Sequence, residues 1–358
     1  MNIRKILKRS AAPALAAVMA LSGCRAKNSG LGKLTGAHLP DSWDSRMEIW
    51  AAPAYSRNGS KLLEMDIDFD TNETEAADAY RDCILNNSSE RAKEIYDTFT
   101  YFSCLEPGIE SKAFDDRPSL IPYYAKGGSD RAVIIIPGGG FGFKSINTDD
   151  AQGKEIAQAL SSEGIHAFVL YCRTNPYVYP TCVLDLQRAV RYLRFQCEFF
   201  GFDPEKISLI GYGSGAYIAA DYISHVQGTD RFPEDYVMDY MDEIDDSVQK
   251  AALISPVLSF EDHIPMLYGL YGKDACETAD GIENLLERTD LSKHTGRTIP
   301  QMVICGAADS IYKPARTASY ITAAQNAGTE VSVSVIEKGT HVLEARTYRK
   351  DLISWLKQ

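Results

Sequence analysis

The sequence predicts an α/β fold with a mostly parallel sheet and helices on both of its faces. From about residue 116 onward, short apolar runs rich in Val and Ile alternate with segments of helical periodicity. These runs are apolar throughout, as in strands that are buried on both faces. Glycine-rich turns follow several of the runs. Alternating β and α elements favour a parallel sheet covered on both sides.

The predicted strands are short and the predicted helices lie between them. We expect strands at 132–137, 166–172, 206–211, 250–255, 300–305 and 331–336, with a flanking strand at 117–125. We expect helices near 150–163, 183–199, 215–227, 314–327 and 344–357. The second of these carries apolar residues at spacings of three and four, as does a helix that lies on a sheet. The carboxyl ends of the strands are the expected position of the functional site.

Composition limits the function classes. The chain has 358 residues, of which 45% are hydrophobic and 24% are charged, so it can bury a large core. Its net charge is −12. Nucleic-acid binding needs a basic face, so we expect no nucleic-acid partner. The segment "DYMDEIDDS" (239–247) predicts a solvated acidic loop rather than a metal site.

The first residues have the layout of an export signal. A basic start is followed by the apolar run "APALAAVMAL" and then by "LSGC", which ends at Cys24. This arrangement is similar to the lipobox of bacterial lipoproteins, in which the signal is cut before a cysteine that is then lipidated. An ordinary secretion signal with an incidental cysteine is the alternative. We therefore predict a signal peptide over 1–23 and an extracytoplasmic, membrane-anchored lipoprotein held by acyl chains on Cys24, without a spanning helix.

The remaining chain divides into three parts. Residues 24–38 contain Cys24 and a polar, glycine-rich tether. Residues 39–115 lack the alternation of strands and helices, although two helices are predicted at 74–86 and 89–102. We predict that they form an extension packed on the core. Residues 116–358 form the main α/β domain.

Three stretches after predicted strands contain residue types suited to catalysis. "PGGGFGF" begins at Pro137, and its residues Gly138, Gly139 and Gly140 can present backbone N–H groups to a ligand. "VICGAADSIYKP" contains Asp309, and "VIEKGTHVLEA" contains His341. An aspartate that orients a histidine, which in turn acts as general base, is the arrangement of a hydrolytic triad. Taken singly, the aspartate is as well explained as a turn cap and the histidine as a structural residue.

Residues 117–357 resemble the acetylesterase and feruloyl-esterase-like branch of the α/β-hydrolase superfamily, which is related to the hormone-sensitive-lipase-like esterases. The stretches that carry the resemblance are "PGGGF", "GIHAFVLYCRTNPYVYPTCVLDLQRAVRYLR", "FGFDPEKISLIGYGSGAYIAA", "CGAADSIYKP" and "KGTH". The resemblance implies an α/β-hydrolase fold, an oxyanion loop at the glycines, and Asp309 and His341 as triad members. It also implies a small-molecule or carbohydrate ester as ligand, with no metal or cofactor.

The nucleophile position departs from this family. Its members have G-F-S-A-G after the strand, where the nucleophile occupies a sharp turn flanked by small residues. Alignment with "GYGSGAYIA" places Gly213 at the nucleophile position and Ser214 one residue later. Ser214 would then begin the helix, cap its N–H groups and supply an oxyanion donor. Alternatively, Ser214 is a shifted nucleophile.

Two functions are therefore open at this point. One is a surface-anchored carboxylic-ester hydrolase that uses Asp309 and His341, with Ser214 as a possible shifted nucleophile. The other is a catalytically disabled homologue, with Gly213 at the nucleophile position, that binds an acylated glycan or a small ester.

Overall fold

The structure is a computed structural model, and it describes residues 47–50, 118–141, 153–173, 178–230, 232, 238–276, 278–294, 296 and 298–358. The predicted signal peptide, the tether and the helices at 74–86 and 89–102 lie outside these residues. In the described part of the chain, no helix has the length and apolar character needed to cross a membrane.

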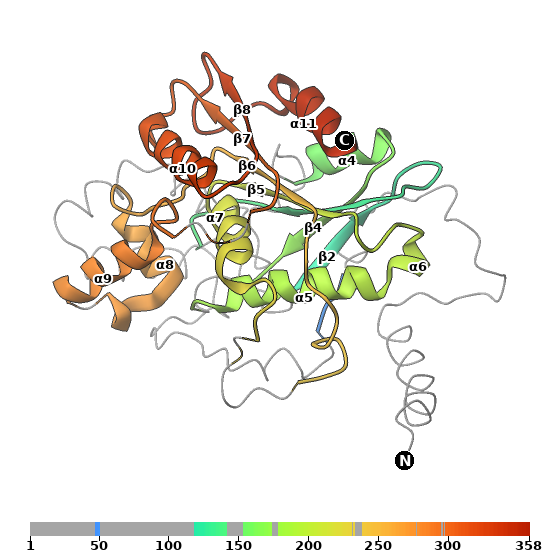
Figure 1. Cartoon of the computed structure of the whole chain (residues 1–358), viewed down its shortest axis with the longest axis horizontal. Helices are drawn as coiled ribbons and strands as arrows, with labels where there is room; N and C mark the ends of the chain where they lie inside the picture. The colour runs from blue at the N-terminus through green and yellow to red at the C-terminus, as the bar shows by residue number, and fades with distance from the viewer. Residues whose placement is uncertain are drawn as a thin grey trace, which may run out of the picture.

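A single eight-stranded sheet organises the molecule (Figure 1). Its strand order is β1-β2-β4-β3-β5-β6-β7-β8. The strands β3 to β8 run parallel to one another, whereas β1 and β2 are antiparallel at one edge. Their bounds are β1 Met47–Glu48, β2 Ser119–Tyr123, β3 Ala132–Ile136, β4 His166–Tyr171, β5 Ile207–Tyr212, β6 Lys250–Ile254, β7 Gln301–Gly306 and β8 Val331–Ile336. The predicted mostly parallel sheet is confirmed, strand by strand.

Helices cover both faces of the sheet, as predicted. In Figure 1, α4 and α11 lie on one side and α5 and α7 on the other. The helices are α4 Lys154–Ser162, α5 Thr181–Phe195, α6 Cys197–Phe200, α7 Ser214–Asp221, α8 Ile264–Ala275, α9 Ala279–Thr289, α10 Pro314–Asn326 and α11 Arg349–Lys357. A π-helical turn, Tyr222–Val226, continues α7, and a short 3₁₀ turn, Ala345–Thr347, precedes α11. Two helices that were not predicted, α8 and α9, lie between β6 and β7.

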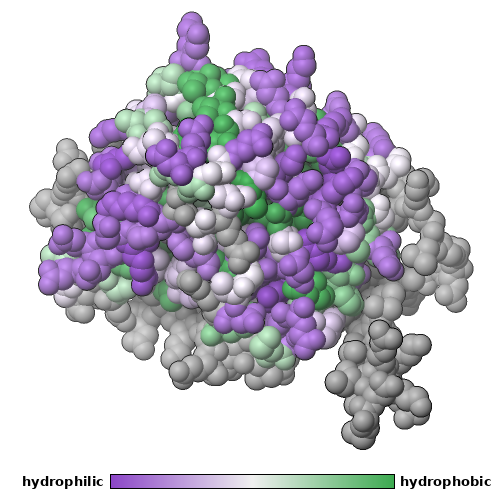
Figure 2. Space-filling view, in the orientation of Figure 1, coloured by the Kyte–Doolittle hydropathy of each residue, from purple (hydrophilic) through white to green (hydrophobic). Residues whose placement is uncertain are grey.

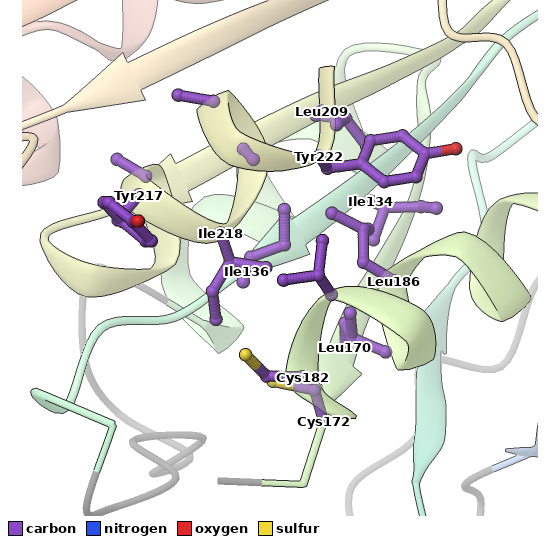
Figure 3. Packing of buried hydrophobic residues seen from close by; sticks show 14 of the residues in the cluster. Ile134, Ile136, Leu170, Cys172, Cys182, Leu186, Leu209, Tyr217, Ile218 and Tyr222 are labelled. Carbon is purple, nitrogen blue, oxygen red and sulfur yellow. The ribbon is translucent and has the colours of Figure 1, made fainter. Parts of the chain in front are cut away.

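Alternate residues of the central strands enter two separate cores. Ile134 and Ile136 of β3 face the core shared with α5 and α7, whereas Val133 and Ile135 face the core shared with α4 and α11. Figure 3 shows the first core, in which Ile134, Leu170 and Leu209 from three strands meet side chains of α5 and α7. Full burial of one such side chain contributes about 1.5–3 kcal/mol. This packing fixes the carboxyl ends of the strands, where the loops of the site begin.

The edge strand β8 is more exposed than the strands inside the sheet. Val333 and Val335 are 47% and 56% exposed. The face drawn in Figure 2 is mostly hydrophilic, with an apolar strip near the top, where Figure 1 draws β7 and β8. β8 is the last strand of the sheet and pairs with β7 alone among the described strands.

The acidic segment 239–247 is not the solvated loop that its composition predicts. Asp242 and Asp246 are buried, and three arginines of α5 face this segment. Arg188 pairs with Asp239 at 2.6 Å and with Asp242 at 3.2 Å. The prediction was wrong because charge in the sequence does not reveal a partner helix that carries a row of arginines.

Candidate active site

A sharp turn joins β5 to α7, and Gly213 occupies its apex. Gly213 has φ 51° and ψ −113°, a left-handed conformation that is strained for residues with a side chain. Its N–H donates to the carbonyl of Ile254 at 3.0 Å, and its carbonyl accepts from Val257 at 3.2 Å. The turn is therefore held by β6 and by the segment after it.

The glycines on either side of Gly213 are required by close backbone contacts. A Cβ on Gly211 would lie 2.5 Å from Cα of Ala216, and one on Gly215 would lie 2.2 Å from the carbonyl oxygen of Ile136. Small residues two before and two after the apex are the mark of a nucleophile elbow. The structure thus centres this turn on Gly213.

Asp309 and His341 come together at the ends of β7 and β8. Nδ1 of His341 lies 2.9 Å from Oδ2 of Asp309. The loops approach closely, because a Cβ on Gly306 would lie 2.2 Å from the carbonyl oxygen of Gly339. Oδ1 of Asp309 accepts the N–H groups of Ile311 and Tyr312, each at 2.9 Å. The carboxylate is therefore fixed by three hydrogen bonds.

His341 faces the apex of the turn. A Cβ built on Gly213 would lie 3.5 Å from Nε2 of His341, and no other atom of the described residues, apart from its chain neighbours, lies within 4 Å of it. A side chain at position 213 would therefore point toward the imidazole. Gly213, Asp309 and His341 occupy the relative positions of nucleophile, histidine partner and base in a triad.

Ser214 faces another part of the site. Its Oγ accepts the N–H of Gly140 at 2.9 Å, and the side chain is buried. No hydrogen bond joins Ser214 to His341 among the described residues. The predicted capping of α7 by the Ser214 hydroxyl is wrong. No side-chain hydrogen bond caps this helix, and its N-cap residue is Gly213. Ser214 is the first residue of α7, and its side chain contacts the glycine loop.

The glycine loop after β3 approaches the start of α7. Gly139 and Gly140 have φ values of 131° and 63°, and Phe141 has φ 66°. Gly138 also belongs to the described part of this loop, whereas residues 142–152 lie outside it. Gly140 and Ser214, two of the four residues predicted to supply oxyanion donors, are therefore in contact. The other two, Gly138 and Gly139, directly precede Gly140 in the chain.

Several known proteins are similar to this chain. Residues 121–261 match the BD-FAE family. An acetyl ester-xyloside bifunctional hydrolase from Caldicellulosiruptor lactoaceticus is similar in structure, with a TM-score of 0.56, 22% identity and coverage of 67% of this chain and 88% of its own. The chain has an α/β-hydrolase fold.

Further relatives of this hydrolase fold carry related descriptions. A truncated carbohydrate esterase from gut microbiota has a TM-score of 0.54 and 16% identity, covering 69% of this chain and 93% of its own. An acetylxylan esterase from Xylanibacter ruminicola is 22% identical over 255 residues, which are 68% of this chain and 48% of the relative. The chain thus spans about half the length of that curated relative. These proteins share the α/β-hydrolase fold with this chain.

Aromatic residues without a motif of their own pack against the glycine loop. Phe141 is buried, and its ring packs edge-on against Tyr217 and Phe260, with centroids 5.8 Å apart in each pair. This anchoring supports the left-handed backbone of Phe141 at the end of the glycine loop. The aromatic residue directly after three glycines was the available signal.

A second histidine lies beside the dyad. His263 is buried, and its ring lies 6.1 Å from that of Tyr312, whose N–H bonds to Asp309. Burial lowers the pKa of His263, and the neighbouring His341 lowers it further. The neutral imidazole is therefore favoured. His263 follows β6 without a recognisable motif, so no sequence pattern predicts its position beside the dyad.

Proposed function

We propose that this chain is a surface-anchored member of the ester-hydrolase class that binds a carbohydrate ester and does not hydrolyse it through a serine triad. The observation that carries the proposal is the 3.5 Å between Nε2 of His341 and the Cβ position of Gly213. The base and its aspartate are arranged for a nucleophile at residue 213, and glycine supplies none. Removal of a triad serine leaves only the small residual rate from binding and the oxyanion donors.

The ligand class comes from the relatives. Their descriptions include an acetylxylan esterase, a carbohydrate esterase and an acetyl ester-xyloside hydrolase. The fold that this chain shares with these proteins supports an acylated glycan, or a small ester, as its ligand. Asp309 would hold the imidazole of His341 in one orientation toward this ligand.

Hydrolysis with Ser214 as a shifted nucleophile is the second candidate. The intact hydrogen bond of 2.9 Å between Asp309 and His341 favours it, because a dyad without a proton-transfer partner has no catalytic use. In that reaction the Ser214 hydroxyl would attack the ester carbonyl and give its proton to Nε2. The imidazolium would protonate the leaving alcohol, and water would then cleave the acyl-enzyme. Ser214 would first have to leave Gly140 and turn toward His341.

Hydrolysis of p-nitrophenyl acetate by the full chain tests both candidates. We expect the unsubstituted chain, Ser214→Ala and His341→Ala to remain at the background rate. Gly213→Ser should gain at least about 100-fold over Gly213→Ala, because loss of a triad serine costs far more than this in active enzymes. The two substitutions impose the same backbone strain at φ 51° and differ by one hydroxyl, so Gly213→Ala is the matched control.

The outcomes separate the candidates. Activity in the unsubstituted chain that both Ser214→Ala and His341→Ala abolish would establish the shifted nucleophile and reject the binding proposal. Activity that survives His341→Ala would reject a role for the dyad in either reaction.

The location of the protein is a separate proposal. We propose that acyl chains on Cys24 hold it at an extracytoplasmic membrane surface, because a basic segment, an apolar segment and "LSGC" follow in the order of a lipoprotein signal. A labelled fatty acid supplied to the producing cells should be incorporated into the unsubstituted chain and not into Cys24→Ala. Equal labelling of the two proteins would contradict the anchor.

A further inference from the structure

The position in front of Gly213 faces the imidazole of His341. Among the described residues other than Tyr212 and Ser214, Nε2 of His341 is the atom found within 4 Å of the Cβ position at residue 213. In a triad enzyme the serine hydroxyl fills this space and donates its hydrogen bond to the imidazole. In this chain a group of the ligand can take that place.

The Asp309–His341 pair sets the polarity of this space. The Asp309 carboxylate is an acceptor, so Nδ1 of His341 carries the proton that bridges the 2.9 Å between them. In the neutral ring Nε2 is then an acceptor. A ligand group in front of Gly213 must therefore donate a hydrogen bond. A hydroxyl can donate one, whereas an ester group has no N–H or O–H to offer.

The N–H of Gly140 is already engaged and is not open to an ester carbonyl. Esterases direct backbone N–H groups at the oxygen on which negative charge develops. Here the N–H of Gly140 already donates to Oγ of Ser214, and this hydroxyl is 74 residues away in the chain. The hydroxyl of Ser214 thus accepts the hydrogen bond that the Gly140 N–H would otherwise donate to an acyl carbonyl.

We propose that the site binds its carbohydrate ester through a free hydroxyl of the glycan, which enters the space in front of Gly213 and donates to Nε2 of His341. The Ser214 hydroxyl, by taking the N–H of Gly140, reduces recognition of an acyl carbonyl. The inference rests on the proposed binding function. It selects a hydroxyl-bearing carbohydrate over a small ester, and an unsubstituted position of that carbohydrate over an acetylated one.

Isothermal titration calorimetry of the full chain with xylotetraose and with fully O-acetylated xylotetraose tests this inference. The unsubstituted chain should bind xylotetraose at least about 10-fold more tightly, since one good hydrogen bond is worth about one factor of ten. Gly213→Ser places the protein's own hydroxyl on Nε2 and should weaken xylotetraose binding by about 10-fold. His341→Ala should weaken it to a similar extent and does not alter the strained turn.

Ser214→Ala gives the complementary measurement. Freeing the N–H of Gly140 should strengthen binding of the acetylated ligand and narrow the preference for xylotetraose. Lys357→Ala is the control, because Lys357 forms an exposed ion pair with Glu163 at the end of α11 and should leave both affinities unchanged.

The possible results distinguish this inference from the proposed function. Tighter binding of the acetylated ligand by the unsubstituted chain, or full xylotetraose affinity in His341→Ala, would overturn the hydroxyl inference and leave glycan binding in place. Binding of neither ligand, together with Ser214-dependent hydrolysis of p-nitrophenyl acetate, would overturn both.

Discussion

The N–H of Gly140 donates a hydrogen bond to Oγ of Ser214 over 2.9 Å, so the displaced serine is tied to the glycine loop. We predict that this contact limits any activity restored at residue 213. In Gly213→Ser, adding Ser214→Ala should raise kcat/KM for p-nitrophenyl acetate by about 10- to 100-fold, because one oxyanion donor is worth about 10²–10³ in kcat. Steady-state kinetics of the single and double variants measure the effect.

A matched substitution controls for crowding at this position. Ser214→Thr in the same Gly213→Ser background keeps a hydroxyl near Gly140 and should leave kcat/KM close to that of the single variant. Equal kcat/KM of Gly213→Ser with and without Ser214→Ala would show that the Gly140 N–H is not needed for turnover.

Asp309 is predicted to act on the tautomer of His341 rather than on folding. In Gly213→Ser, Asp309→Asn should lower kcat by about 10⁴, as when an amide replaces a triad carboxylate and favours the wrong tautomer. The Asn oxygen can still accept from the N–H groups of Ile311 and Tyr312, so Tm should change little. Kinetics and thermal unfolding are measured together. A large fall in Tm with an unchanged kcat would assign Asp309 a structural role instead.

The sequence predicted the sheet and its covering helices because burial on both faces leaves a clear chemical pattern. β3, with "AVIII", can satisfy its apolar side chains only between two helical layers. By contrast, α8 and α9 follow β6 as an insertion whose position no strand rhythm determines. Their existence depends on packing of residues such as Leu267 and Leu285 against the core, which a local pattern does not reveal.

The site was predictable in its parts, but the direction of one side chain was not. Spacing of small residues predicted Gly213 at the apex, and chain order predicted that Asp309 and His341 lie near it. The capping role expected for Ser214 was wrong because its hydroxyl bonds to Gly140. The proximity of Gly140 to the start of α7 cannot be read from the sequence. That proximity depends on the close approach of Gly215 to the end of β3.

A buried ion pair attaches the segment 47–50 to the domain and should be costly to break. Nη2 of Arg173 lies 2.6 Å from Oδ1 of Asp185, and both side chains are fully buried. Nε1 of Trp50 donates to the same carboxylate oxygen at 2.9 Å. Asp185→Asn removes the negative charge that faces the buried arginine and should reduce the free energy of unfolding by about 3–5 kcal/mol. Urea denaturation measures this change.

An exposed pair provides the comparison for this prediction. Glu163 and Lys357 form an ion pair with both side chains substantially exposed to solvent. Glu163→Gln should change the free energy of unfolding by less than about 1 kcal/mol. Similar effects of the two substitutions would contradict the importance assigned to burial at Asp185.

Stability should fall in mild acid because of His166. This histidine begins β4, is fully buried, and its Nδ1 accepts the N–H of Ala125 at 3.1 Å. Burial lowers the pKa of His166 from 6.5 to about 4, although the backbone of Phe200 partly opposes the shift. Between these values the unfolded chain binds a proton that the folded chain does not. Stability is therefore fully present above about pH 6.5 and decreases as the pH falls toward 4.

The size of this effect follows from the shift. A lowering from 6.5 to about 4 corresponds to about 3 kcal/mol lost across this window, with no further loss from this residue below it. His166→Asn keeps an acceptor for Ala125 but removes the titrating group, so its stability should decrease less between pH 7 and pH 4. Urea denaturation of both proteins at several pH values measures the difference, in which the other titrating groups largely cancel. Parallel stability curves for the two proteins would show that the buried imidazole is not responsible.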